Sequence, residues 1–125
     1  MEKLKQLKCN GEVDYDFSHD ILFFKTKNRE YVKSMELDNI TLDIDAKNYI
    51  TGIQIFEASK FLQTSKETLL SVQKWQFQSM VYEGKLEVRL VFQIKVRNKI
   101  IEKNPIIVES LTEPLPNSEL VCATV

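Results

Sequence analysis

The chain has 125 residues, 43% of them hydrophobic and 28% charged, with a formal net charge of −1 at pH 7. This composition is typical of one soluble globular domain over residues 1–125, and it argues against a disordered or fibrous chain. No apolar run approaches the roughly 20 residues needed to cross a bilayer, and the lysine-containing N-terminus lacks the apolar stretch of a signal peptide. We therefore expect a cytoplasmic protein without membrane contact.

The first half of the sequence predicts a meander of short β-strands. Val13 and Tyr15 alternate with aspartates, which indicates a half-buried strand. Further strands are predicted over 21–24, 31–37, 40–44 and 49–56, with polar turns between them. Gly52 lies inside the last of these strands, where a glycine marks a bulge or a close approach of another backbone.

The middle of the sequence changes to helical spacing. Ala58, Phe61 and Leu62 predict a helical segment over about 57–74, with a break at 63–65 as an alternative. Thr64 and Glu67 have the spacing of a capping box at a helix start. Because so short a helix is marginal alone, its apolar stripe is expected to lie on a sheet.

The second half is again β-rich over about 75–111. Strict alternation from Leu86 to Val96 predicts a long strand with one buried and one wet face. Residues 112–125 are expected to be loose, with a short final strand over 120–125 as an alternative. The predicted fold class is α+β, in which one domain holds an antiparallel β-meander, a central helical segment and a second antiparallel β-meander.

A residue pattern spans segment 13–62. It consists of Tyr15, Asp16, Asp20, Ser34, Glu36, Asp43, Asp45, Gly52, Ile53, Ile55, Ala58 and Ser59. In this pattern the segment resembles a small prokaryotic family of unknown function, found mainly in bacteria and archaea; the β-rich second half goes beyond the minimal family unit. The resemblance implies a β-meander followed by a helix, no catalytic residues, and a binding role, because members often look like partners of small toxin-like proteins.

Turn and packing chemistry accounts for the core of the pattern, Tyr15, Asp16, Asp20, Gly52, Ala58 and Ser59. Asp16 and Asp20 flank a tight turn, where carboxylates accept hydrogen bonds from backbone amides. Ala58 is small enough for close contact between helix and sheet, and Ser59 can cap a helix or bond locally. We therefore interpret the pattern as a structural signature.

The sequence offers little for catalysis, and we predict no cofactor and no metal. His19 is the only histidine, so one chain cannot build a Ser-His-Asp triad with a remote histidine or a multi-histidine metal site. Four aspartates on two strands, Asp14, Asp16, Asp43 and Asp45, are an alternative site for Mg²⁺ or Ca²⁺ if those strands are neighbours. Cys9 and Cys122 are expected to be unpaired thiols in a reducing compartment, with a disulfide between the chain ends as the alternative.

Charge is distributed unevenly along the chain. Residues 12–60 hold ten acidic and six basic side chains, whereas residues 73–103 hold seven basic and three acidic ones. This asymmetry suggests a basic face that meets an acidic partner, or simply packing of the two halves on each other. The predicted binding face consists of Arg89, Lys95, Arg97, Gln76 and Gln78.

The function predicted from these features is non-enzymatic protein binding or self-assembly. Short strands leave edges that pair with another chain, so we expect a homodimer through a β edge or the second-half meander, or a complex with another protein. One alternative is a small-ligand or metal-assisted enzyme with a pocket between helix and sheet. Another is a single-stranded nucleic-acid binder that uses the basic β half, although Trp75, Phe77 and Phe92 fall on the apolar side of their strands.

Overall fold

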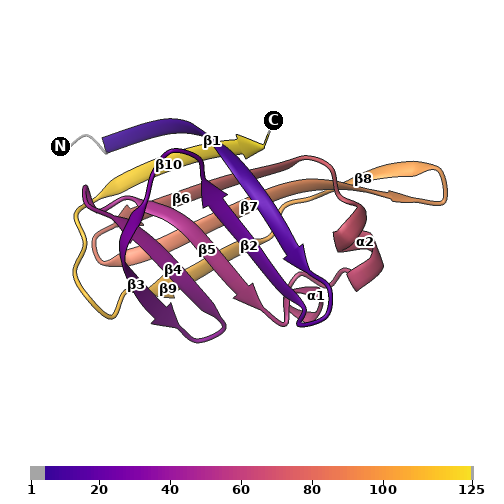
Figure 1. Ribbon diagram of the computed structural model, residues 1–125, viewed down its shortest axis with the longest axis horizontal. Coiled ribbons are helices and arrows are strands. Elements are labelled where there is room, and N and C mark those ends of the chain that lie inside the picture. The colour runs from indigo at the N-terminus through magenta and orange to yellow at the C-terminus, as the bar shows by residue number, and fades with distance from the viewer. Residues whose placement is uncertain (1–4, 125) are drawn as a thin grey trace.

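The computed structural model describes residues 5–124, and its strands form one ten-stranded mixed sheet (Figure 1). The strands are β1 (Lys5–Asp16), β2 (Ile21–Thr26), β3 (Tyr31–Leu37), β4 (Ile40–Asp45), β5 (Ile50–Phe56), β6 (Trp75–Tyr82), β7 (Lys85–Val96), β8 (Lys99–Lys103), β9 (Ile106–Ser110) and β10 (Ser118–Thr124). The helices are α1 (Ala58–Phe61) and α2 (Lys66–Ser71).

The sheet consists of two halves joined by the first and last strands. Its strand order is β3-β4-β5-β2-β1-β10-β6-β7-β8, and β9 pairs with the first part of β7. Every pairing is antiparallel except that of β1 with β10, which is parallel and runs from Lys5 opposite Ser118 to Gly11 opposite Thr124. We call this β1–β10 pairing the seam.

The sheet curls so that its two halves pack face to face. Phe24 of β2 and Phe77 of β6 stack with ring centroids 4.6 Å apart. Neighbouring strands are about 4.8 Å apart, so in a flat sheet β2 and β6 would be separated by roughly 14 Å. The hydroxyl of Ser79 likewise donates to the carbonyl oxygen of Ile50 at 3.4 Å, from β6 to β5. One apolar core therefore fills the space between the two halves.

The predicted α+β fold class is wrong. The two helices hold four and six residues, and the rest of the regular structure is a single sheet. The predicted helical segment over 57–74 is interrupted because Gln63 adopts a left-handed backbone conformation with φ of 52°, so the alternative with a break at 63–65 is the one that forms. Ala58 and Leu69 are buried against the core, so apolar residues of this segment do face inward, but they lie on two short helices.

The predicted capping box is also wrong. The residue that caps α2 is Ser65, whose side-chain oxygen accepts a hydrogen bond from the Thr68 amide at 3.2 Å. The Thr64 hydroxyl instead donates to the carbonyl oxygen of Leu62 at 3.1 Å. A serine one residue later competes for the same role, and the spacing of Thr64 and Glu67 alone does not reveal which residue adopts the extended cap conformation.

Both ends of the described chain are more ordered than the sequence suggested. The first strand begins at Lys5 rather than near Val13. The stretch expected to be loose contains β10, which lies in the middle of the sheet; Val125, the last residue of the alternative final strand, lies outside the described residues. Within residues 5–124, no helix has the length and apolar character to cross a membrane.

Candidate functional site

The predicted binding face lies on the outward side of β6 and β7, but it is divided into two parts. Gln78 and Arg89 are paired across the two strands, and Gln76 is opposite Val91. Lys95 and Arg97 lie farther along, roughly 20 Å or more from Arg89, since each strand residue advances the chain by about 3.4 Å. Gln76 and Lys95 line the same hollow, but Arg89 and Arg97 lie far apart, so the five residues do not form one cluster.

In the first part of this face, the side chains of Gln78 and Arg89 already contact other residues of the chain. The Gln78 side-chain amide donates to Glu119 Oε1 at 2.7 Å, and an Arg89 nitrogen lies 3.5 Å from Glu87 Oε1. Arg89 and Glu87 are about half and one third exposed, so their ion pair is weak and solvated. Contacts of this kind are typical of the polar, solvent-facing side of a sheet.

The second part belongs to a hairpin that extends beyond the body of the molecule. We call residues 93–103, the end of β7 with β8, the β7–β8 hairpin (Figure 1). The last residue of β7 with a β6 partner is Phe92, which is opposite Trp75. Residues 93–96 are paired with β8 on one side only, so their other edge carries unpaired backbone groups.

The β7–β8 hairpin is both apolar and basic. Ile100 is 72% exposed, and Val96 and Ile101 are each 41% exposed. Within the hairpin, four basic side chains accompany one acidic side chain: Lys95, Arg97, Lys99 and Lys103 with Glu102. An exposed apolar surface of this kind on an unpaired strand edge is typical of an interaction site.

Two hollows lie next to the end of α2, and the first of them is at the base of the hairpin. One, of about 610 Å³, is lined by Trp75, Phe92, Ile94, Lys95, Ile100 and Glu102, among others. The other, of about 420 Å³, includes Glu12, Asp14, Lys27, Leu70 and Val72 in its lining. Gln73 and Trp75 line both hollows, which places the basic hairpin and the acidic residues of β1 at the same end of the molecule.

The signature residues Tyr15, Asp20 and Ser59 come together at the end of β1. The Tyr15 hydroxyl donates to Asp20 Oδ1 at 2.6 Å. Ser59 donates its hydroxyl to Asp20 Oδ2 at 2.6 Å and its amide to Oδ1 at 3.0 Å. Burial alone would raise the pKa of Asp20, but hydrogen bonds from Ser59 and Tyr15 outweigh it, and the pKa lies below the usual value. The same burial, with the Asp20 contact, raises the pKa of Tyr15.

The neighbouring turn is held by Asp16. Its carboxylate accepts the His19 amide at 3.1 Å and lies 2.8 Å from the imidazole Nδ1. The hydrogen bond from the His19 side chain lowers the pKa of Asp16. His19 itself is 74% exposed, so it lies in a solvated turn.

Gly52 and Ala58 occupy places where a larger side chain would collide. A Cβ atom on Gly52 would lie 2.9 Å from the carbonyl oxygen of Phe24 and 3.0 Å from Asp43 Oδ2. The pairing of β4 with β5 shifts at this point, which leaves Thr51 as the extra residue of a bulge beside Gly52. Ala58 is fully buried at the start of α1.

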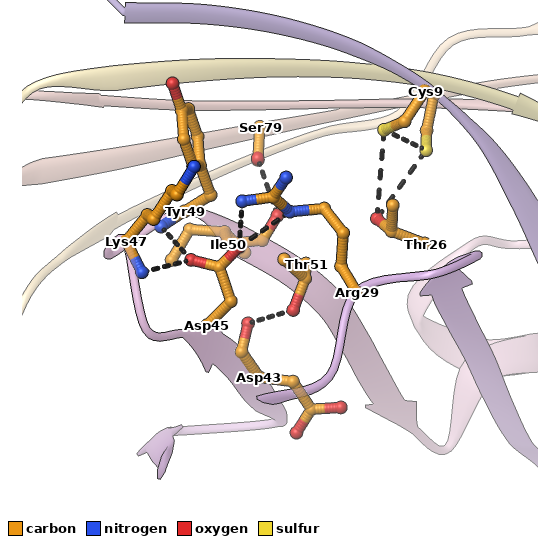
Figure 2. Close-up of polar contacts among 11 residues, drawn as sticks. Cys9, Thr26, Arg29, Asp43, Asp45, Lys47, Tyr49, Ile50, Thr51 and Ser79 are labelled. Carbon is orange, nitrogen blue, oxygen red and sulfur yellow. Dashed lines mark hydrogen bonds and ion pairs between the residues drawn. The ribbon is translucent and has the colours of Figure 1, made fainter. Parts of the chain in front are cut away.

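A polar cluster that the sequence did not predict surrounds Asp45 at the end of β4 (Figure 2). Its Oδ1 accepts the amides of Lys47 and Tyr49, at 2.9 and 3.0 Å. Its Oδ2 accepts the Arg29 Nε at 2.6 Å, and the Arg29 guanidinium lies over the Tyr49 ring at 5.2 Å. The Asp45 and Arg29 side chains are 6% and 22% exposed, so this is a largely buried ion pair that fixes the β4–β5 turn.

The four-aspartate cation site does not form. Asp14 and Asp16 lie on β1, whereas Asp43 and Asp45 lie on β4, and β2 and β5 separate these strands. That separation is roughly 14 Å at about 4.8 Å per strand. Residues 5–124 hold no group of three or more metal-ligating side chains.

The two cysteines, for which a disulfide was the predicted alternative, come into contact with each other and with Thr26, which the sequence did not predict as their neighbour. Cys9 and Cys122 are opposite each other in the seam, and their sulfur atoms lie 2.8 Å apart. Thr26, fully buried, lies beside both sulfurs (Figure 2). Only the positions of the cysteines near the two chain ends hinted at this contact.

Comparison with known proteins agrees with the predicted family resemblance. Residues 12–59 match the family described as "Protein of unknown function (DUF2283)". A Methanosarcina mazei protein named "Putative hypoxanthine phosphoribosyltransferase" is 33% identical over 100 residues, which cover 80% of this chain and 81% of that protein. The chain belongs to the family of that protein. An uncharacterised protein of Methanocaldococcus jannaschii is 26% identical over 111 residues, which cover 88% of this chain and 96% of that protein.

Part of the chain therefore matches a family of unknown function, as predicted, and these two relatives are archaeal proteins. The finer residue pattern by which the family was predicted stays a prediction. No solved structure matches the chain at a significant level.

Proposed function

We propose that this protein is a non-enzymatic binding protein that assembles as a homodimer through its β7–β8 hairpin. The observation that carries the proposal is the end of β7, where residues 93–96 have an unpaired edge. Exposed apolar side chains on the same hairpin, Val96, Ile100 and Ile101, would lose contact with water in a complex.

Charge favours a second copy of this chain as the occupant of that edge. The β7–β8 hairpin is basic, and Glu12 and Asp14 line the hollow on the other side of Trp75. Glu12 lies 3.9 Å from Lys25, and both side chains are more than half exposed, so this contact leaves the carboxylate accessible to a partner. Two copies related by a two-fold axis at this end would each place a basic hairpin beside the partner's acidic hollow.

The oligomeric state tests the proposal directly. We expect dimers in sedimentation velocity at micromolar concentration, and a monomer for the double variant Ile100→Glu/Ile101→Glu. Val32→Glu is the matched control, because Val32 is 65% exposed on β3 at the opposite edge of the sheet. A monomeric wild type, or dimer loss in the Val32 variant to the same extent, would contradict the proposal; far-UV circular dichroism checks that each variant folds.

A charge exchange tests the choice of partner surface. Asp14→Lys and Lys95→Glu are each expected to weaken the dimer, and the combined variant is expected to restore it, because the two charges are exchanged across the interface. If the single variants leave the dimer unchanged, the acidic hollow is not the contact. Recovery of affinity at high salt, where the repulsion between like charges is screened, distinguishes this charge effect from unfolding.

Other occupants of the hairpin are less well supported. An extended segment of another protein, such as the small toxin-like proteins suggested by the family resemblance, would add to the same β7 edge. A wild-type chain that stays monomeric and binds such a segment would favour that alternative. We further propose a cytoplasmic location, the setting in which two free thiols are usual.

The structure gives less support to nucleic acid as a partner. A single-stranded nucleic acid stacks its bases on exposed aromatic rings. Trp75, Phe77 and Phe92 are at most 3% exposed, and on the outward face of β6 it is Tyr82 that is exposed.

An enzymatic role has one observation in its favour, the hollow of about 420 Å³ between α2 and β1, whose lining includes Glu12 and Asp14. Among the described residues, every buried side-chain nitrogen or oxygen atom has a hydrogen-bond partner, so none is left aimed at a ligand. The transferase name of the Methanosarcina mazei protein is not carried over. Nucleotide phosphates are commonly held at the N-terminus of a helix after a glycine-rich loop, whereas Gly11 and Gly52 lie in strands and Gly84 in a hairpin turn.

A further inference from the structure

The seam brings the two cysteines of the chain into direct contact. Cys9 of β1 and Cys122 of β10 are register partners, although 113 positions separate them in the sequence. Their sulfur atoms lie 2.8 Å apart, closer than ordinary non-bonded sulfur atoms. Adjacent strands hold their Cα atoms within the range that a disulfide bridges, about 4.4 to 6.8 Å.

The two thiols differ in their access to solvent. Cys122 is fully buried, whereas Cys9 is partly exposed, so a dissolved oxidant meets Cys9 first. Burial and the contact with Cys9 raise the pKa of Cys122 to about 12, which keeps this group protonated near neutral pH. The Cys9 thiol donates to the Thr26 hydroxyl oxygen at 4.0 Å, and the same hydroxyl lies 3.6 Å from the Cys122 sulfur.

We propose that Cys9 and Cys122 form a reversible oxidation site that responds to hydroperoxides. With hydrogen peroxide, the Cys9 thiol loses its proton and its sulfur attacks one peroxide oxygen; the O–O bond breaks, Cys9 becomes a sulfenic acid, and the departing hydroxide takes up that proton as one water. The Cys122 sulfur then attacks the Cys9 sulfur, an S–S bond forms, and the S–O bond breaks. The Cys122 proton leaves with the departing hydroxide as a second water, so that two thiols are oxidised and one peroxide is reduced.

The new bond would lie across the seam, the pairing that connects the two halves of the sheet. It would close a loop that contains almost the whole described chain, and loop closure of this length restricts the unfolded state strongly. Oxidation is therefore expected to raise the melting temperature by several degrees and to leave the fold unchanged.

The test uses the wild-type protein, so it does not depend on the folding of a variant. After treatment with a small excess of hydrogen peroxide, we expect both thiols to disappear from a thiol assay in denaturant, with a mass loss of about 2 Da. Millimolar glutathione is expected to restore both thiols. Persistence of the two thiols, or oxygen adducts without an S–S bond, would overturn the site.

Matched single variants control for oxidation between molecules. Cys9→Ser and Cys122→Ser each keep one thiol and are expected to show no stabilisation by peroxide. If either variant is stabilised as much as the wild type, the seam disulfide is not the cause. A wild-type bond that glutathione cannot reduce would overturn the claim of reversibility.

Discussion

Asp20 accepts hydrogen bonds from both the hydroxyl and the backbone amide of Ser59, and this contact ties the β1–β2 turn to the start of α1. The two residues are separated by 39 positions, so the contact joins the end of β1 to the residues that follow β5. Tyr15 adds a third hydrogen bond from β1. The signature residues therefore act together as a structural clamp.

Stability is expected to depend on the ionisation of Asp20. Its pKa is lowered in the folded state from the ordinary 3.8, so its contribution is present above that value and is lost as the pH falls through the folded-state pKa. Asp20→Asn is expected to lower the free energy of unfolding at pH 7 by about 1–3 kcal/mol and to flatten its decline below about pH 4. Urea unfolding at several pH values measures both effects. An unchanged profile in this variant would contradict the clamp.

The Asp45–Arg29 pair is expected to contribute more to stability than Asp43, the half-buried aspartate two residues earlier. Asp45→Ala leaves Arg29 without its carboxylate and two turn amides without an acceptor, so we expect a loss of about 3 kcal/mol in urea unfolding. Asp43→Ala is the matched control on the same strand. The Asp43 side chain accepts one bond from Ser34 at the surface, and its loss should cost less than about 1 kcal/mol. Equal losses of unfolding free energy in the two variants would show that the buried ion pair contributes no more to stability than the Asp43 contact.

The contact between the two halves of the sheet can be tested at Phe24. Phe24→Ala removes a ring that is 2% exposed and stacked on Phe77, and we expect a loss of about 3–5 kcal/mol. Phe17→Ala is the control, because Phe17 is 41% exposed and contacts Lys66 through a cation–π interaction, with an expected loss near 1 kcal/mol or less. Thermal or urea unfolding gives both values. Similar values for the two variants would argue against face-to-face packing of the halves.

The position of the helix cap gives a smaller but clear prediction. Ser65→Ala removes the acceptor for the Thr68 amide and is expected to cost about 1 kcal/mol. Glu67→Ala is expected to cost less, because the capping-box contact predicted for Glu67 with Thr64 is not the one that the helix uses. If Glu67→Ala costs more than Ser65→Ala in urea unfolding, the assignment of Ser65 as the cap is wrong.

The sequence predicted individual strands better than their arrangement. The alternation of apolar and polar residues located β4 and most of β7 to within a few residues, because burial of one face leaves a period-two pattern. The same rule failed for Lys5–Gly11, where lysines, Asn10 and a buried glycine weaken the pattern. The helical segment was overestimated because apolar spacing does not reveal the left-handed residue at Gln63.

The candidate site was predictable only where it consists of local chemistry. The turn role of Asp16 follows from its spacing, since its carboxylate accepts the amide of His19. The turn role predicted for Asp20 is wrong, because its carboxylate accepts the amide of Ser59, 39 positions away. Arg29 with Asp45, and Cys9 with Cys122, meet through the topology of the sheet, which a single sequence does not specify. The exposure of Ile100 on β8 could not be predicted for a related reason. The apolar alternation of β7 continues past Phe92, where its pairing with β6 ends, so the sequence does not reveal that this end of the hairpin leaves the sheet.

The parallel seam also has a consequence for the order of events during biosynthesis. β1 is the first described strand to be synthesised, yet one of its edges stays unpaired until β10 has been made, after all the other described strands. Contacts over such long sequence separations slow folding, because the chain loses entropy before it gains the contact. We expect the five strands β1 to β5 to associate early on the ribosome, and the centre of the sheet to be the last part of the protein to form.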